Sequence, residues 1–247
     1  MEVGFYTDRG RIRDINEDAC GILRNERIFI VADGVGGNRS GEIASRGAVE
    51  GIADYVEEHP VSGVETRDDV KQYFNDCFRL INNRIYTLAQ QDISKRGMAT
   101  TLVAVYQVHN ILYVMNIGDS RAYVFRKGKM QQITDDHTYV NTLLEAGVIT
   151  EEEAEVHENR NMITRAIGAD QEVYADLFEV VIKPDDIILM CTDGLYGEIS
   201  DHIIKEKLSE NKPMDDICRD LTEAANQNGG TDNITIICMK ITEDDIK

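Results

Sequence analysis

Short apolar runs that end in turn residues recur along the whole chain, and this pattern limits the folds that are open to it. Eight runs rich in β-branched residues are typical of strands, at residues 2–7, 28–32, 101–108, 111–116, 122–125, 177–182, 187–191 and 234–241. His109-Asn110 separates two of these runs and Lys127-Gly128 follows another, and both dipeptides predict antiparallel hairpin turns. The chain is therefore expected to be rich in antiparallel sheet.

Two pairs of segments show the period of an α-helix instead. Ser40 is a candidate N-cap, and small or apolar residues follow it at helical spacing, at Ile43, Gly47, Ala48, Ile52 and Val56. Thr66 and Asp69 predict a capping box at the start of a second helix, which extends to about Leu88. A second pair is expected at residues 200–209 and 214–228. Consecutive helices cover one face of a sheet, so we expect stacked sheets with helix pairs outside them.

Composition and charge narrow the class of protein. The 247 residues contain three prolines and no Ser/Gly-rich linker, so we expect one domain over residues 1–247. The net charge of −19 argues against nucleic-acid partners and against an anionic membrane surface. No apolar run is long enough to span a membrane, and we see no signal peptide at the N-terminus. Five cysteines without a CxxC pair fit a reducing cytoplasm.

Several aspartates stand where strand-like runs end, beside glycine or a polar turn residue. These are Asp33, Asp119, Asp193 and Asp232, and Asp18 joins them from a short acidic segment. A carboxylate at the end of a buried strand is costly unless a cation pairs with it. Divalent metal ions take such oxygen ligands, and a following glycine lets a main-chain carbonyl approach the same ion. A single Asp-Gly pair would be read as a plain turn, but the set indicates a metal site.

Other motifs for phosphate chemistry do not fit the sequence. Glu42 stands where a P-loop needs lysine, and Arg39 stands at the third glycine of a dinucleotide-binding motif. We find no EF-hand loop, no GxSxG nucleophile elbow and no recognisable Cys/His pair. The metal-site interpretation therefore has no competing catalytic motif in this chain.

Taken together, these motifs resemble the metal-dependent Ser/Thr protein phosphatases of type 2C, in their compact bacterial form. The resemblance covers nearly the whole chain and rests on eight motifs in the family's order: residues 13–18, 31–37, 98–102, 117–121, 136–138, 163–168, 192–195 and 232–233. It implies an α+β fold, a four-layer α/β/β/α sandwich with two central antiparallel sheets flanked by pairs of helices. This fold agrees with the strand and helix pattern above.

The resemblance also implies which residues hold metal. Asp33 would bridge two Mg²⁺ or Mn²⁺ ions, with the Gly34 carbonyl on one of them. Asp193 and Asp232 would hold the first ion, and Asp18 would act with Asp33 at the same binuclear centre. These two ions are expected to bind tightly.

Three further residues receive roles from the same resemblance. Glu17 would lie beside the binuclear centre and contact it directly or through water. Asp119, together with Asp193, would hold a third and weaker ion. Arg13 would bind the substrate phosphate, a task that suits the planar guanidinium.

The implied chemistry is hydrolysis of phosphoserine or phosphothreonine by a hydroxide that bridges the two ions, with Arg13 orienting the phosphoryl group. Some family members carry a histidine that could protonate the leaving oxygen, at positions that are Val35 and Asn38 here. The general acid is therefore open. A metal-bound water is one candidate and His137 is another, with orientation of its loop as the alternative role of His137.

Residues 138–161 are polar, acidic and helical in pattern, and they resemble the family's flap beside the active site. We expect this flap to affect substrate choice, with a plain surface insertion as the alternative, and we expect Leu143, Leu144 and Val148 to anchor it.

The sequence thus predicts an active, monomeric phosphatase that acts on phosphoproteins and opposes a bacterial Ser/Thr kinase in the same cell. A catalytically silent interaction module on the same fold is the first alternative. A different two-metal phosphoesterase, such as a nuclease, is the second, and the net charge disfavours it.

Overall fold

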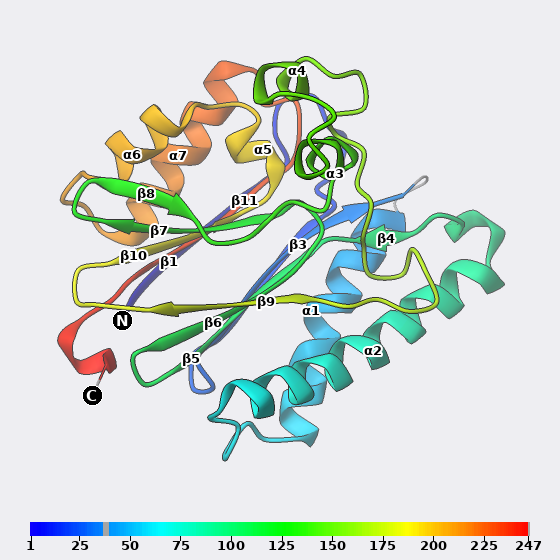
Figure 1. Cartoon of the computed structure of the whole chain (residues 1–247), viewed down its shortest axis with the longest axis horizontal. Coiled ribbons are helices and arrows are strands. Elements are labelled where there is room, and N and C mark those ends of the chain that lie inside the picture. Colours follow the sequence, from blue (N-terminus) through cyan, green and yellow to red (C-terminus); the bar gives the residue numbers. More distant parts are fainter. Residues whose placement is uncertain (37–39, 247) are drawn as a thin grey trace.

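The computed structural model describes residues 1–36 and 40–246, and antiparallel strands form two sheets in it (Figure 1). The first sheet has the strand order β1 (Glu2–Asp8), β11 (Ile234–Lys240), β10 (Ile187–Cys191), β7 (Arg121–Arg126) and β8 (Lys129–Gln132). The second has the order β2 (Asp18–Leu23), β3 (Ile28–Val35), β5 (Leu102–Val108), β6 (Ile111–Ile117) and β9 (Asp176–Val181), and the short β4 (Ala99–Thr100) pairs with β3.

Helices cover the outer face of each sheet. The long helices α1 (Ser40–Glu58) and α2 (Arg67–Gln91) lie on the second sheet, and α6 (Asp201–Leu208) and α7 (Met214–Asn228) lie on the first (Figure 1). The predicted four-layer α/β/β/α sandwich is therefore confirmed. The chain also contains short helical turns. These are α5 (Asp193–Tyr196), directly after β10, and the 3-10 turns Ile93–Lys95 and Glu243–Ile246.

Three apolar cores separate the four layers. The central core lies between the sheets and contains Val31, Val105, Ile188 and Ile237. The other two fill the spaces between each sheet and its helices. Every strand that carries an acidic site residue at its end is thus held on both faces, which fixes the position of that end.

The start of α2 follows the sequence prediction, and the buried face of α1 follows it in part. Thr66 and Asp69 form the expected capping box. On α1, Ala48, Ile52 and Val56 are buried as their spacing predicts, whereas Ile43 is 42% exposed and Gly47 is only partly buried. Ala44 is buried in place of Ile43, so small residues such as Ala44 and Ala48 make up much of the buried face. Small side chains let this helix lie close to β2 and β3.

The two predicted hairpin turns are confirmed. His109 and Lys127 have φ values of 49° and 51°, in the left-handed region, and each lies between paired strands. The strand pattern missed β2, β4 and β8. β4 and β8 are short. β2 and β8 lie at sheet edges, so most of their side chains are only partly buried or exposed and they show no apolar run.

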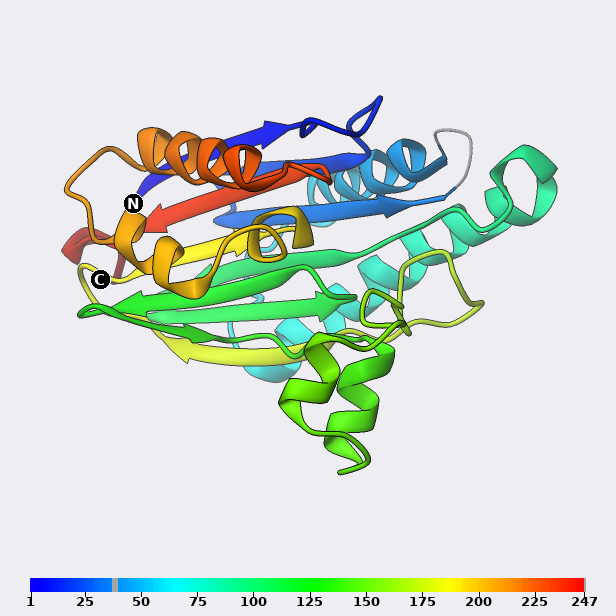
Figure 2. The ribbon, with the colours of Figure 1, turned by 90° about the horizontal axis from the view of Figure 1, so that it is seen from above.

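The flap contains two short helices, α3 (Tyr139–Glu145) and α4 (Glu151–Glu155), which project from the body of the sandwich (Figure 2). Val140 and Ala154 are its buried apolar residues, while Leu143 and Leu144 are partly buried. The expectation that Val148 anchors the flap was wrong, because Val148 is 65% exposed in the turn between the helices.

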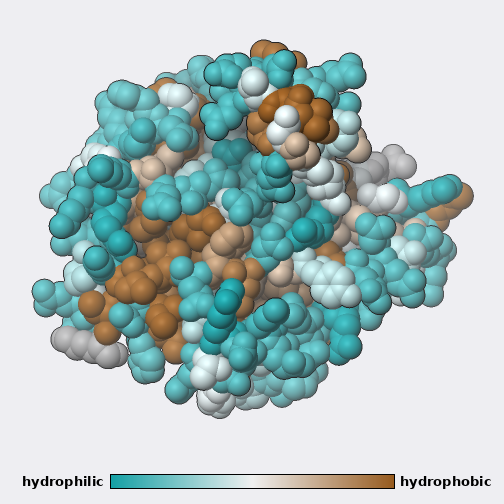
Figure 3. Space-filling model, viewed as in Figure 1, coloured by the Kyte–Doolittle hydropathy of each residue, from teal (hydrophilic) through white to brown (hydrophobic). Residues whose placement is uncertain are grey.

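The surface is mainly hydrophilic on the face shown in Figure 3, with hydrophobic side chains gathered between β8 and β9. These are the edge strands of the two sheets, so the central core reaches the surface here, and Ile133, Phe178 and Val180 pack against it while partly exposed. Among the described residues, no helix is both long enough and apolar enough to cross a membrane.

A buried asparagine of α2 holds the loop that connects the flap to β9. Asn82 Oδ1 accepts the Gly168 N–H at 2.7 Å, and Asn82 Nδ2 donates to the carbonyls of Asp170 and Gln171 at 3.0 and 3.1 Å. The same loop pairs Ile167 with Thr100, next to the strand end that carries Asp33. This side chain therefore couples the outer helix layer to the site.

We predict that Asn82→Ala lowers the free energy of unfolding by about 2–4 kcal/mol, because the buried Gly168 N–H and two partly buried carbonyls lose their partner. Chemical denaturation measures the change. Asn83→Ala, at the exposed neighbouring position of the same helix, is the matched control and should change stability by less than about 0.5 kcal/mol. Equal effects of the two substitutions would contradict the structural role of Asn82.

Candidate metal centre

Five aspartates and one glutamate gather at the end of the two sheets beside the flap. Asp18 begins β2 and Asp33 lies near the end of β3, and the two residues are direct partners across the antiparallel pair. Asp193 is the first residue of α5 after β10, and Asp232 lies just before β11. Asp119 lies in the turn between β6 and β7. The fold thus brings together residues that are far apart in the sequence, since the acidic set extends from Glu17 to Asp232.

The electrostatics of this cluster are unfavourable in the absence of a cation. Burial is the main cause that raises the pKa of Asp33 well above its ordinary value, and the charges of Asp18, Asp193 and Asp119 raise it further. Burial likewise raises the pKa of Asp18 to about 7, and burial with the charge of Asp232 raises the pKa of Asp193 to about 6. The cluster therefore favours either bound protons or bound cations.

Several buried carboxylate oxygens of the cluster have no hydrogen-bond partner. They are Glu17 Oε1, Asp18 Oδ1 and Asp193 Oδ1. The other Asp18 oxygen accepts a hydrogen bond from Thr192 Oγ1 at 2.9 Å. An unpaired buried carboxylate oxygen is costly, and oxygen is the ligand that Mg²⁺ and Mn²⁺ prefer. The residues present thus fit divalent cations.

Arg13 forms an ion pair with Asp232, which is one of the expected metal ligands. Arg13 Nη2 donates to Asp232 Oδ2 at 2.6 Å, and the Arg13 side chain is 50% exposed. In the part of the chain that the structure describes, no three acidic, histidine or cysteine side chains already stand at the spacing of a metal site. Both Asp232 oxygens are engaged, since Oδ1 also accepts the Asn233 N–H at 2.8 Å.

Gly34 has a steric reason for being glycine. A Cβ at this position would lie 2.1 Å from the Gly41 carbonyl oxygen and 2.6 Å from the Glu17 carbonyl oxygen. The first turn of α1 can therefore pack against the end of β3 only if this residue has no side chain. Val35 follows and is 44% exposed, while Gly37 and Asn38 lie outside the described residues.

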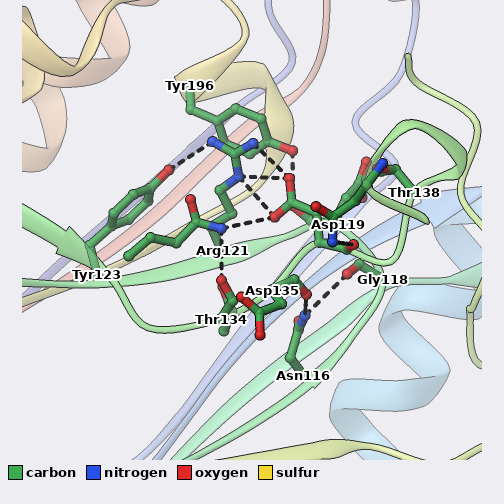
Figure 4. Close-up of polar contacts among 12 residues, drawn as sticks. Asn116, Gly118, Asp119, Arg121, Tyr123, Thr134, Asp135, Thr138 and Tyr196 are labelled. Carbon is green, nitrogen blue, oxygen red and sulfur yellow. Dashed lines mark hydrogen bonds and ion pairs between the residues drawn. The ribbon is translucent and has the colours of Figure 1, made fainter. Parts of the chain in front are cut away.

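Asp119 is held differently from the other carboxylates. Its side chain is only 5% exposed, and burial, followed by the charge of Asp193, raises its pKa to about 7. Gly118 before it has a φ of 104°, so a residue with a side chain would be strained there. Tyr196 Oη donates to the Asp119 carbonyl at 2.8 Å (Figure 4).

His137 orients this turn. Its Nδ1 accepts the Gly118 N–H at 2.9 Å, so the ring proton lies on Nε2, which donates to Asp176 Oδ2 at 3.0 Å. Burial lowers the pKa of His137 and favours the neutral form. Because both ring nitrogens are engaged and the ring is buried, the structure favours the loop-orienting role over a role as general acid.

Sequence reasoning assigned no role to three motif residues that position the site. Thr192 links Asp18 to the first sheet, since its Oγ1 also accepts the Thr235 N–H at 3.0 Å. Thr101 Oγ1 accepts the Asp33 N–H at 2.9 Å. Asn233 Oδ1 accepts the Glu17 N–H at 2.7 Å. All three belong to the motifs of the sequence analysis, and a polar side chain beside a candidate metal ligand or an apolar run is the signal that could have found their role.

The cluster opens into a cleft of about 620 Å³ between the flap and α5. Asp119, Asp193 and Asp232 line it from the cluster, and Val140, Leu144, Ala154, Glu151 and Glu155 line it from the flap. The flap is therefore one wall of the space into which a ligand of the acidic cluster must enter.

Comparisons with known proteins agree with this fold. The model of the protein phosphatase 2C family matches residues 11–237. The serine/threonine phosphatase stp of Listeria innocua is 35% identical over 243 residues, which cover 97% of this chain and 96% of that protein. The protein phosphatase PhpP of Streptococcus pneumoniae is 36% identical over 250 residues, with 99% of each chain covered.

Solved structures show the same likeness. The serine/threonine phosphatase Stp1 from Staphylococcus aureus has a TM-score of 0.90 at 34% identity, with 98% of this chain and 95% of that chain covered. The catalytic domain of the serine/threonine protein phosphatase PstP, solved in complex with two manganese ions, has a TM-score of 0.84 at 32% identity, with 98% of both chains covered. The chain belongs to the protein phosphatase 2C family.

We predict that Mn²⁺ stabilises the protein, and more strongly at about pH 7.5 than at about pH 5. Raised carboxyl pKa values favour the folded metal-free protein at low pH, and this contribution is lost as the pH rises through about 6 to 7. Cations compete with the protons and replace them. A site filled about a hundredfold above its Kd adds about 2.7 kcal/mol, which raises Tm by about 5–10 °C in a chain of this size.

Thermal unfolding with Mn²⁺ or with EDTA at the two pH values measures this stabilisation. An increase in Tm that is the same at both pH values would show that the ions bind away from the carboxylates with raised pKa.

Proposed function

We propose that the cleft beside the flap is the active site of this chain, which is a metal-dependent protein serine/threonine phosphatase. The observation that carries the proposal is the set of carboxylates with buried, unpaired oxygens, of which Asp193 lines this cleft. Family membership supplies the reaction, hydrolysis of phosphoserine and phosphothreonine in proteins. No observation favours a silent interaction module or a nuclease.

Each carboxylate has a proposed place at the binuclear centre. Asp33 bridges the two ions, in keeping with its position among the other acidic residues, and the Gly34 carbonyl is a further ligand. Asp193 and Asp232 hold the first ion, and Asp18 acts with Asp33.

Glu17 contributes its unpaired Oε1, either directly or through water. Two divalent ions at such a centre supply Lewis acidity and a nucleophilic hydroxide at neutral pH.

Arg13 binds the substrate phosphate in this proposal. Its guanidinium lies at the rim of the cluster, and its contact with Asp232 places it next to the metal ligands. Once Asp232 turns to a cation, Arg13 is free to donate to two phosphate oxygens, which orients the phosphoryl group and offsets its charge.

Asp119 and Asp193 form the proposed site of a third and weaker ion. Both side chains line the cleft, and Asp119 lies outside the Asp18–Asp33 strand pair. We further propose that this site assists protonation of the leaving oxygen, since exposed Val35 has no proton to give and His137 is engaged on both nitrogens.

The relatives, which are named as phosphatases of bacteria, support a proposal for the cellular setting. We propose that the chain is a cytoplasmic monomer and a single domain that opposes a Ser/Thr kinase of the same bacterial cell. We also propose that the flap over residues 138–161 affects which phosphoproteins are bound, because Glu151, Glu155 and the buried Ala154 line the cleft. A phosphoprotein that enters this cleft meets the flap before it reaches the acidic cluster.

Release of phosphate from a phosphothreonine peptide tests the active site. We expect release to need Mn²⁺ or Mg²⁺, and we expect Asp33→Asn to reduce turnover about a thousandfold or more, because a neutral amide cannot bridge two cations. Asp33→Asn should unfold in EDTA at the same Tm as the parent or higher, since it removes a like charge opposite Asp18.

Asp54→Asn, at an exposed position of α1, is the matched control for this experiment and should keep full turnover. A folded Asp33→Asn variant within tenfold of the parent would rule out the bridging role.

Asp119→Ala should separate the third site from the binuclear centre. We expect a large loss of turnover on a phosphothreonine peptide and a smaller loss on p-nitrophenyl phosphate, whose leaving group is a weak base that needs little protonation. The measurement is kcat on both substrates at saturating Mn²⁺. Equal fractional losses would remove Asp119 from proton transfer.

A further inference from the structure

Arg121, at the start of β7, is held by three different contacts. Its Nε and Nη2 form a bidentate ion pair with Asp136, with the Nη2–Oδ2 distance at 2.6 Å. Its Nη1 donates to Tyr123 Oη at 3.1 Å. Its Cζ lies 3.6 Å from the centre of the Tyr196 ring, a cation–π contact (Figure 4). We call Arg121, Asp136 and Tyr196 the arginine clamp.

The clamp fixes the ring of Tyr196, and Tyr196 in turn contacts the turn that carries Asp119. Tyr196 Oη donates to the Asp119 main-chain carbonyl at 2.8 Å. Tyr196 is also the last residue of α5, the helical turn whose first residue is Asp193. A single side chain therefore connects the backbone of one acidic residue to the short helix that begins with the other.

The other contacts of the turn that carries Asp119 leave the Tyr196 hydroxyl as the link between this turn and α5. Gly118 is held from the opposite side, where it exchanges hydrogen bonds with His137, and Ser120 Oγ lies 2.7 Å from Thr101 Oγ1. These contacts tie the turn to the second sheet and to the base of the flap. Within the described residues, Tyr196 supplies the hydrogen bond that ties the turn to α5.

We infer that Tyr196, fixed by Arg121, is a positioning residue that sets the separation between the carboxylates of Asp119 and Asp193. The inference rests on the proposed function, in which these two side chains share the third and weaker ion. Two carboxylates on separate elements hold one cation well only if their separation is fixed beforehand. The half-buried ion pair with Asp136 holds the Arg121 guanidinium over the tyrosine ring.

Tyr196→Phe is the direct test, because it removes the hydroxyl and keeps the ring on Arg121. We expect Tyr196→Phe to reduce the affinity for the weakly bound Mn²⁺ about tenfold, which is the effect of one lost hydrogen bond. The affinity for the two tightly bound ions should stay unchanged. Free Mn²⁺ in titrations can be counted by its electron paramagnetic resonance signal, which does not depend on turnover. The Mn²⁺ concentration for half-maximal turnover of a phosphothreonine peptide should rise by a similar factor.

Tyr123→Phe is the matched control. It removes another buried hydroxyl that contacts the same arginine but does not contact the Asp119 turn, so weak Mn²⁺ binding should stay at the parental level. Arg121→Lys keeps the charge but loses the bidentate pair, and should weaken the same class of ions as Tyr196→Phe.

Asp119→Ala, measured in parallel, separates failure of this inference from failure of the proposed third site. Loss of the weak ion in Asp119→Ala, with parental weak binding in both Tyr196→Phe and Arg121→Lys, would overturn the positioning role and keep the site. Retention of all ions in Asp119→Ala would overturn the site and the positioning role together.

Discussion

The site depends on one unfavourable arrangement, in which Asp18 and Asp33 stand directly opposite each other on neighbouring antiparallel strands. Like charges at such positions repel each other, and burial adds to the cost. Asp193 and Asp232 approach from the other sheet and increase the repulsion. The fold tolerates this arrangement because the three apolar cores hold the strand ends in place. A divalent cation is the partner that turns the repulsion into stabilisation.

Hydrogen bonds with neutral side chains hold the Asp18 carboxylate and the main chain of Glu17 in place. Thr192 connects Asp18 to the first sheet, and Asn233 holds the N-terminal loop that carries Glu17. Arg13 pairs with Asp232 at the rim, so the residue proposed to bind substrate contacts a residue proposed to bind metal. In the proposed site, metal binding, substrate binding and the packing of the two sheets are therefore linked through a few polar side chains.

Sequence reasoning found the parts of the protein that have a local pattern. The strands with apolar runs, the capping box at Thr66 and the four-layer fold were predicted correctly, and the fold brings together the acidic residues chosen from strand ends. It failed where the pattern depends on tertiary contact. Ile43 was misplaced because small residues decide how close α1 lies to the sheet, and the edge strand β2 shows no apolar run. The clamp around Arg121 was invisible because its three members lie on separate elements.

The most direct test of the account is the position of metal ions in a crystal grown with Mn²⁺. Diffraction data collected at the manganese absorption edge give anomalous peaks only where this metal binds. The account predicts two strong peaks on either side of the Asp33 carboxylate, one of them next to Asp193 and Asp232, with Arg13 released from Asp232. Absence of anomalous density among these carboxylates, with the Arg13–Asp232 pair intact, would contradict it.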